Sequence, residues 1–513
     1  MPFGPTSSAL LAALPLFWLL LGLGVLRMPA WRACVIGLAA TMLVAGLAWK
    51  VPATTIALSA VEGALLGLWP IVSVIFAAMF TYNLAVATGA MDRIRALLSG
   101  VSADRRVQAL LIAWGFSGFL EGAAGFGTAV AIPAAMLIGL GFEPRKAAIL
   151  CLVANTVPVA FGGVGLPVIT LAKVTDTDLA RVTYYTALQL TPLVVVLPLI
   201  LIPMLTGGLA GLRGVVGLCL ASGIAFAVPQ LVLARFVGPE LTAIAGSIAA
   251  MPLVALWARF WPAKTVWRFP GEPVAEPLPA GHTNVREQLV AWAPYLLMLV
   301  FILGTGTLVP PVHDALARAQ SAIPIVPGAK PLTFAWVLNP GTLIFLGGLA
   351  GGLIQGARGA VIAKVLRGTA KQLAATTLTV TAIVALAQVM GHTGMSAAIA
   401  VALAGATGKA FPALSPLIGA LGTFLTGSNT SSNVLFGALQ KQTALQIGAD
   451  PNWLVAANAA GATAGKMISP QSIAVAASAT AQQGREGELL RGTLAQALLY
   501  TVVLGAIVVL LAP

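Results

Sequence analysis

The chain contains twelve apolar stretches, most of them about 20 residues long, and this pattern constrains its fold more than any other feature. A helix needs about 20 mostly apolar residues to cross the hydrocarbon core of a bilayer. Only 8% of the residues are charged and 59% are hydrophobic, whereas soluble domains carry about 25% charged residues. A soluble fold would expose large apolar patches, so we predict an all-α polytopic membrane protein. The candidate spans lie near residues 8–26, 33–49, 58–89, 147–172, 182–206, 212–234, 240–257, 289–309, 341–357, 373–391, 452–480 and 493–512.

Two further stretches, residues 107–140 and 411–447, are apolar but interrupted near their middles by glycine and polar residues. Each is long enough for two partial helices and too short for two full spans with a loop. Backbone that is broken at membrane depth must be packed inside protein or line a wet cavity. We therefore predict two re-entrant hairpins, with the protein divided into scaffold and transport regions.

The distribution of basic residues tests this topology. If the chain starts outside and each hairpin returns to its own side, the inner loops hold many more basic residues than the outer loops, as the positive-inside rule requires. Only Lys466 then remains within a span. The inner residues are Arg27, Arg32, Arg93, Arg95, Arg105, Arg106, Arg145, Lys146, Arg213, Arg259, Lys264, Arg268, Arg286, Arg358, Lys364, Arg367, Lys371, Arg485 and Arg491, and the outer residues are Lys50, Lys173, Arg181, Arg235, Arg318, Lys330, Lys409 and Lys441.

The chain also resembles itself at a separation of about 305 residues. The order of the matches and their nearly constant offset indicate a duplication. Because the charge bias puts the ends of the first hairpin inside and those of the second outside, we predict two inverted repeats. The matches are Thr88-Gly89 with Thr393-Gly394, Phe119-Leu120-x-Gly122 with Phe424-Leu425-x-Gly427, Glu143-Pro144 with Asp450-Pro451, and Asn155, Gly162 and Pro167 with Asn458, Gly465 and Pro470.

Inverted repeats typically place a substrate site near the membrane midplane, between broken helices. This favours a secondary transporter, and a duplicated structural bundle without transport is the alternative. The predicted organisation is N-terminal helices (1–57), a first repeat (58–206, with hairpin 107–140 and broken helix 147–172), connecting helices with a cytoplasmic loop at 258–288 (207–372), and a second repeat (373–513, with hairpin 411–447 and broken helix 452–480).

Glu121 stands at the apparent turn of the first hairpin, within GFSGFLEGAAGFG (115–127). An ionised carboxylate at that depth is costly, so it must be paired, hydrated or protonated. Because removal from water favours the neutral acid, we predict that Glu121 binds and releases a coupling proton. The alternative is a structural carboxylate that accepts hydrogen bonds from backbone amides at the turn.

The second hairpin carries a dense polar cluster within TFLTGSNTSSN (423–433). Hydroxyls, amides and free backbone N–H groups at a helix start suit the carboxylate oxygens of an organic anion. The alternative is polar capping of the two half-helices, but the cluster is larger than capping needs. Its members are Thr426, Ser428, Asn429, Thr430, Ser431, Ser432 and Asn433.

We predict helix breaks at residues 155–158, where Pro158 removes a backbone donor, and at residues 458–461. Lys466 can pair with the substrate carboxylate or with Glu121, or it can extend to the membrane surface. His392 lies at the end of a span and is either a structural polar group or a proton relay. The predicted substrate-binding residues are Gly122, Ala123, Asn155, Thr156, Gly427, Ser428, Asn429, Thr430, Ser431, Asn458, Lys466, Gln471 and Ser472.

No motif of an enzyme or an ATP-driven pump occurs. The sequence has no GxxxxGK[ST] motif, no paired carboxylates and no HExxH motif, so we expect neither catalysis nor a cofactor or metal. The three cysteines lie in apolar runs without metal-type spacing. The basic residues form no patch on a polar domain, which argues against a nucleic-acid partner despite the net charge of +13.

Four strings resemble the bacterial L-lactate permease family: FLEGAAGFGTAVAIP (119–133), NTVPVAFGGVGLP (155–167), FLTGSNTSSNVLFGALQ (424–440) and AANAAGATAGKMISPQSIA (456–474). The resemblance covers essentially the whole chain. It implies proton-coupled uptake of L-lactate, with D-lactate and glycolate as further substrates, by a multi-pass protein of the bacterial inner membrane. The implied partners are therefore a small monocarboxylate, a proton and the lipid bilayer.

That family is similar to the wider ion transporter group, which includes divalent-anion sodium symporters with a Ser-Asn-Thr motif at each hairpin tip. Ser428-Asn429-Thr430 matches this motif, whereas the first hairpin has Glu121-Gly122-Ala123-Ala124 near the corresponding place. This departure favours protons over sodium as the coupling ion. The group also implies an elevator motion, in which hairpins and broken helices slide against a scaffold. A sodium-coupled carboxylate carrier and a passive monocarboxylate channel stay open as alternatives.

Overall fold

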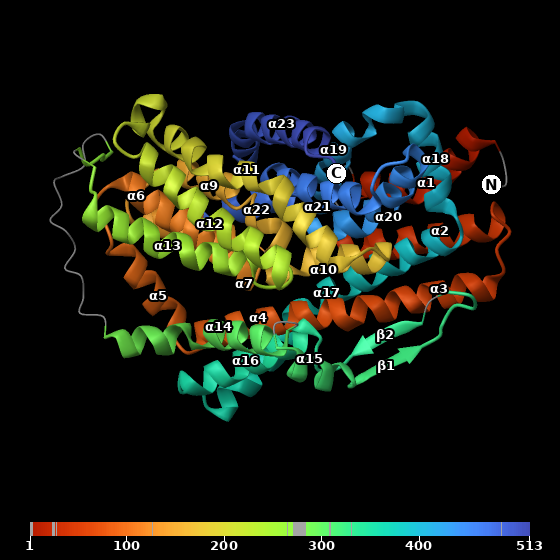
Figure 1. Ribbon diagram of the computed structural model, residues 1–513, viewed down its shortest axis with the longest axis horizontal. Helices are drawn as coiled ribbons and strands as arrows, with labels where there is room; N and C mark the ends of the chain where they lie inside the picture. Colours follow the sequence, from red (N-terminus) through yellow and green to blue (C-terminus); the bar gives the residue numbers. More distant parts are fainter. Residues whose placement is uncertain are drawn as a thin grey trace.

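The computed structural model describes residues 4–22, 26, 28–125, 127–263, 265–269, 284–306, 309–329, 331–483 and 485–513. The basic residues Arg27, Lys264 and Lys330, which were predicted to lie in loops, and residues 270–283 of the predicted loop 258–288 lie outside these residues. Figure 1 shows an elongated bundle whose helices run mainly along its long axis. Within the described part, ten helical stretches are long and apolar enough to cross a membrane.

The N-terminal helices are α1 (Pro5–Leu20), α2 (Ala30–Leu47), α3 (Ala53–Leu66) and α4 (Ser73–Ala87). The π-helical segment η2 (Gly67–Val72) joins α3 to α4 and is kinked at Trp69, whose φ is −136° and ψ 118°. Pro70 explains the kink, because proline disfavours helical geometry in the residue before it. The amphipathic helix α5 (Ala90–Ser99) follows and was not among the predicted elements.

Residues 105–139 form a helix–turn–helix, called hairpin 1. Its first arm comprises α6 (Arg105–Ala109), the π-helical η3 (Leu110–Phe116) and α7 (Ser117–Ala123), and its second arm is α8 (Thr128–Gly139). The arms fold back on each other, since Ser117 Oγ donates to Ala129 O at 2.7 Å. At the base, the Arg105 guanidinium lies 5.9 Å from the Phe142 ring centroid.

Residues 411–447 form hairpin 2, which consists of α19 (Phe411–Thr426) and α20 (Asn429–Ile447). Gly427 closes the turn with a φ of 69°, a conformation that glycine adopts without steric cost. Ser432 Oγ donates to Gly419 O at 2.8 Å and ties the two arms together. Each predicted hairpin range therefore contains helices that fold back on each other across a turn.

Each hairpin is followed by a broken helix, and one of the two predicted break positions is wrong. α9 (Pro144–Ala154) ends at the predicted place, before η4 (Pro158–Phe161) and α10 (Gly162–Thr175), whose residues 163–165 all have positive φ. In contrast, α21 (Pro451–Ile468) continues through 458–461. The break comes at Ser469, with ψ 135°, before α22 (Pro470–Ala479). The reason is proline placement: Gly461 stands where the first repeat has Pro158, and Pro470 forces the break instead.

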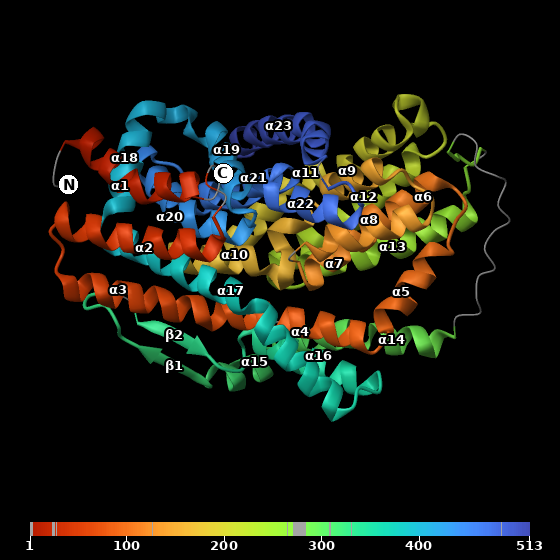
Figure 2. The ribbon, with the colours of Figure 1, turned by 180° about the vertical axis from the view of Figure 1, so that it is seen from behind.

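The backbone repeats where the sequence repeats. Thr88 and Thr393 end their helices with φ/ψ of −87°/−5° and −88°/−5°, and Gly89 and Gly394 begin the next helices with 72°/6° and 79°/6°. In Figures 1 and 2, α6 at the base of hairpin 1 and α18 (Met395–Thr407), which leads into hairpin 2, lie toward opposite ends of the molecule. The segments that lead into the two hairpins therefore lie toward different ends of the molecule.

The remaining helices complete the bundle. The structure also contains a small two-stranded sheet, which the all-α prediction did not include. β1 and β2 pair antiparallel, with Gln320 opposite Ala335 and Ile323 opposite Leu332. The ring centroid of Trp336, directly after β2, lies 5.4 Å from the ring centroid of Trp69 at the kink between α3 and α4. These elements are α11 (Leu179–Thr206), η5 (Leu209–Leu212), α12 (Val216–Phe236), α13 (Thr242–Phe260), α14 (Val285–Thr305), α15 (Pro310–Ala317), β1 (Gln320–Ile323), β2 (Leu332–Ala335), α16 (Pro340–Ile354), α17 (Gly359–His392), η6 (Gly408–Ala410) and α23 (Glu486–Leu510).

Candidate functional site

A cavity of about 590 Å³ lies where the turns of the two hairpins meet. One wall consists of these turns and of the starts of α10 and α22, and the opposite wall consists of residues from the start of α2, from α4 and from α17. Nine of the predicted site residues line it. They are Glu121, Gly427, Ser428, Asn429, Thr430, Ser431, Lys466, Gln471 and Ser472.

Four helices begin at the cavity wall. The lining includes Thr128 at the start of α8, Gly162-Gly163 at the start of α10, Asn429 at the start of α20 and Gln471 at the start of α22. The first N–H groups of a helix have no intrahelical partner and carry positive partial charge. The four helix starts therefore favour an anion in the cavity.

The polar cluster of hairpin 2 divides into capping groups and one open group. Ser428 Oγ accepts a hydrogen bond from Ser431 N at 3.2 Å, and Thr426 Oγ1 donates to Gly422 O at 2.8 Å. Asn433 Nδ2 donates to Pro167 O at 3.0 Å. By contrast, Asn429 is only 3% exposed, and neither its Oδ1 nor its Nδ2 has a hydrogen-bond partner. Buried amide groups are costly unless paired, and Asn429 is the buried member of this cluster whose amide has no protein partner.

Glu121 lies in the last turn of α7, just before the turn of hairpin 1, and it is 4% exposed. Asn155 Nδ2 donates to its Oε2 at 3.0 Å, and Ser117 Oγ donates to Asn155 Oδ1 at 3.4 Å. The carboxylate fits because residue 162 is glycine: a Cβ there would overlap Glu121 Oε1. Asn155 thus orients Glu121 from behind, and Gly162 gives it space at the cavity.

Lys466 lies in the last turn of α21 and faces the cavity instead of extending to the surface. Its Nζ donates to Gly427 O, the carbonyl at the tip of hairpin 2, at 3.1 Å. Of the described lining residues, Glu121 and Lys466 are the two with a formal charge.

The other predicted site residues do not line the cavity. Gly122 packs against Ala243 and Ile244 of α13, and Ala123 is buried. Thr156 Oγ1 donates to Leu152 O at 3.4 Å, within its own helical turn. These positions, together with Asn155, build the structure around Glu121 and do not face the space beside it.

Asn458 and His392 lie in separate contacts. Asn458 Nδ2 donates to Asn433 Oδ1 at 3.0 Å, and its Oδ1 accepts from Gln440 Nε2 at 3.2 Å, so the amide joins α21 to hairpin 2. His392 Nε2 lies 3.4 Å from Glu62 Oε2 between α17 and α3. Neither residue lines the cavity.

Sequence reasoning missed the wall opposite the hairpin turns. α17 contributes Gln372, Thr376 and Thr379 at helical spacing, and Asn83 Nδ2 of α4 donates to Gln372 Oε1 at 3.0 Å. Trp31 at the start of α2 also lines this side. The positions stand in ordinary apolar spans, and only the three-to-four-residue spacing of polar residues along 372–379 could have indicated them.

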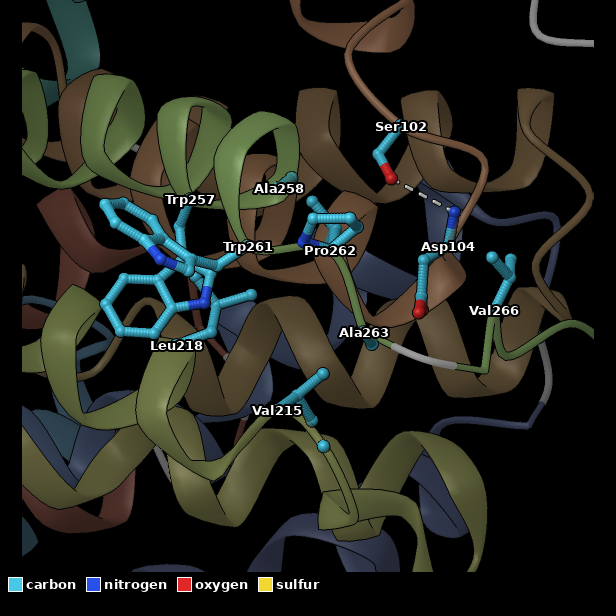
Figure 3. A pocket seen from close by; sticks show the side chains of 12 residues that line it. Ser102, Asp104, Val215, Leu218, Trp257, Ala258, Trp261, Pro262, Ala263 and Val266 are labelled. Atoms are coloured by element: carbon cyan, nitrogen blue, oxygen red, sulfur yellow. Dashed lines mark hydrogen bonds between the residues drawn. The ribbon is translucent and has the colours of Figure 1, made fainter.

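A second cavity, of about 50 Å³, lies near the base of hairpin 1 (Figure 3) and contains none of the predicted site residues. Trp257 and Trp261 form one side of it. Asp104, also in its lining, is already bonded to Arg106, whose Nη2 lies 2.7 Å from Asp104 Oδ2. Arg106 donates further to Gly211 O, Arg213 O and Thr265 O, so this region fixes the hairpin base. Among the residues with assigned positions, no group of three or more His, Cys, Asp or Glu could hold a metal ion.

Fold and cavity together define a polytopic membrane protein with an internal site that favours an anion. The family model described as L-lactate permease matches residues 8–513. The L-lactate permease of Streptococcus iniae is 42% identical over 450 residues, which cover 87% of this chain and 93% of that protein. Glycolate permease GlcA of Escherichia coli (strain K12) is 37% identical over 547 residues, covering 99% and 97%. The L-lactate permease of Bacillus subtilis (strain 168) is 37% identical over 529 residues, covering 96% and 93%.

This chain belongs to the L-lactate permease family, which confirms the resemblance seen in its motifs. With its apolar helices, it is a multi-pass protein of the bacterial inner membrane. Its relatives are named permeases, which points away from an enzyme. Among solved structures, it is similar to the YdaH transporter of Alcanivorax borkumensis, with a TM-score of 0.47, 16% identity and 86% coverage of each chain.

Proposed function

We propose that this chain is a secondary active transporter that imports L-lactate, and also D-lactate and glycolate, together with a proton. The observation that carries the proposal is the unpaired, buried Asn429 amide at a cavity where four helices begin. An amide offers a donor and an acceptor, and a 2-hydroxy acid offers carboxylate oxygens and a hydroxyl to match them. The names of the similar permeases support this substrate class.

Glu121 is the proposed proton carrier. It is buried beside the cavity and receives a hydrogen bond from Asn155. A carboxylate held away from water takes up a proton more readily than a free one. In the proposed cycle, Glu121 takes a proton from the outer side as lactate binds, and it gives up that proton to water on the inner side.

An elevator-type movement is proposed for the change of access. Gly461 and Gly465 bring the backbone of α21 against the Pro416 and Ala420 carbonyls of α19, so hairpin 2 and α21 form one closely packed body. The opposite wall comes from α2, α4 and α17. In this scheme, the hairpins with α9–α10 and α21–α22 slide along that wall. Spin labels at the exposed Lys409 and Arg358 should give two distances whose populations change with lactate, and a single unchanged distance would contradict the movement.

The test of function is uptake of labelled L-lactate into proteoliposomes. An inwardly directed proton gradient should drive accumulation above equilibrium, and glycolate should compete better than succinate. Glu121→Gln should lose accumulation and keep lactate–lactate exchange, whereas the matched control Glu287→Gln, at an exposed position at the start of α14, should behave as wild type.

Two outcomes would support other functions, and a third would change the role of Glu121. Accumulation driven by a sodium gradient alone would favour a sodium-coupled carrier, as the Ser428-Asn429-Thr430 motif suggests. Equilibration without accumulation would favour a passive channel. Accumulation by Glu121→Gln at the wild-type level would remove Glu121 from the proton pathway.

A further inference from the structure

The two charged side chains of the cavity belong to different repeats. Glu121 comes from hairpin 1, and Lys466 comes from the last turn of α21. Between them no ion pair within 4 Å is found, and the Lys466 ammonium bonds to Gly427 O instead. Of the three donors of an ammonium group, one is occupied by described protein atoms. The other donors remain for a ligand carboxylate beside Asn429.

We infer that Lys466 balances the charge of this cavity and thereby makes proton coupling obligatory. The inference rests on the proposed function and adds a residue role to it. In the empty cavity, the charges of ionised Glu121 and Lys466 sum to zero. In the loaded cavity, the neutral Glu121 acid, Lys466 and the lactate anion also sum to zero. Lactate without a proton leaves a net charge of −1, and a proton without lactate leaves +1.

An unbalanced charge within the membrane is strongly disfavoured. The two half-loaded states should therefore change access roughly a hundredfold less often than the balanced ones. Lactate then crosses with a proton or hardly at all. The proton moves from water onto a Glu121 carboxylate oxygen and later returns to water, so no other reactant is needed.

A structural role is the competing explanation, because Lys466 also binds the carbonyl at the C-terminal end of α19. Lys466→Gln separates the two roles: the glutamine amide still offers a donor to Gly427 O but carries no charge. Lys466→Arg keeps the charge. Lys409, which is exposed before hairpin 2, provides the matched control Lys409→Gln.

The experiment measures L-lactate uptake in proteoliposomes in which the proton gradient and the membrane potential are set separately. Wild-type uptake should follow the proton gradient and ignore the potential. Lys466→Gln leaves a charge of −1 in both the empty and the loaded cavity, so it should lose at least about tenfold of the gradient-driven uptake. Lys466→Arg and Lys409→Gln should keep gradient-driven, potential-independent uptake.

Two results would overturn the inference. The first is potential-dependent uptake by the wild type, a measurement that needs no variant to fold. The second is gradient-driven uptake by Lys466→Gln at the wild-type level. If wild-type uptake ignores the proton gradient altogether, the proposed function itself fails. The double variant Glu121→Gln/Lys466→Gln adds a separate requirement: its empty cavity is neutral, so uptake should follow the potential and not the proton gradient.

Discussion

Gly162 gives the sharpest test of how Glu121 is held. Its φ of −63° and ψ of 155° suit any residue, so Gly162→Ala introduces no backbone strain. The added Cβ would overlap Glu121 Oε1 and approach Glu121 Cδ and Cγ at 3.2 Å. Overpacking of this kind costs about 1–3 kcal/mol, equivalent to about 5- to 150-fold in an equilibrium. Since the Glu121 side chain is the contacted group, the cost is relieved by moving the carboxylate away from Asn155 Nδ2.

The assay is the initial rate of L-lactate uptake driven by a proton gradient. Gly162→Ala should reduce that rate about 5- to 150-fold. Gly368→Ala on α17, where an added Cβ meets nothing within 4 Å, is the control and should leave the rate unchanged. Glu121→Asp shortens the side chain and should partly rescue Gly162→Ala. Wild-type uptake by Gly162→Ala would refute the placement of a functional Glu121 against residue 162.

Three further predictions follow from other contacts. Asn155→Leu removes the hydrogen bond to Glu121, and such a bond is worth about 1.5–3 kcal/mol when one group is charged. Gradient-driven lactate uptake should therefore fall at least about tenfold while lactate–lactate exchange persists. Equal loss of uptake and exchange would contradict an orienting role for Asn155. Asp104→Asn leaves the buried Arg106 without its carboxylate and should lower the free energy of unfolding by about 3–5 kcal/mol, measured as a lower unfolding temperature in detergent. The control Asp92→Asn, at a side chain that is 75% exposed, should leave the unfolding temperature unchanged. Burial raises the pKa of Glu240, in the loop between α12 and α13, to about 7. Between pH 4.5 and 7 the folded protein therefore binds more protons than the unfolded chain, so its stability falls as the pH rises through this window. Glu240→Gln should flatten that fall in stability.

Much of the fold follows from local rules. Apolar length predicts the spans, and glycine-rich interruptions predict the two hairpins, because a broken apolar run has few other ways to satisfy its backbone. Pro470 places the preceding Ser469 in an extended conformation and so ends α21, whereas Pro158 follows a residue that stays helical, Val157, and contributes to its break by lacking a backbone donor. The prediction at 458–461 was wrong because it transferred the break from one repeat to the other without the proline that causes it.

The site was harder to predict than the fold, because side-chain roles depend on contacts between distant segments. Asn429 and Asn458 look equally polar in sequence, yet Asn458 makes hydrogen bonds through both Nδ2 and Oδ1, to Asn433 and Gln440, while the Asn429 side chain has no partner. The turn of hairpin 1 uses Gly125 and Gly127, which have positive φ, so Gly122 is free to pack on α13. The α17 wall has only one local signal, the spacing of polar residues along 372–379, because it becomes a site only when the hairpins face it.

In the proposed binding mode, a small carboxylate lies between the tip of hairpin 2 and the side chains of Glu121 and Lys466. The most direct measurement is an electron cryomicroscopy map of the full chain in lipid nanodiscs with saturating L-lactate. New density is expected within hydrogen-bond distance of the Asn429 amide and the Lys466 ammonium. Lactate density elsewhere, for example in the small cavity beside Trp257 and Trp261, with the space beside Asn429 unchanged, would contradict it.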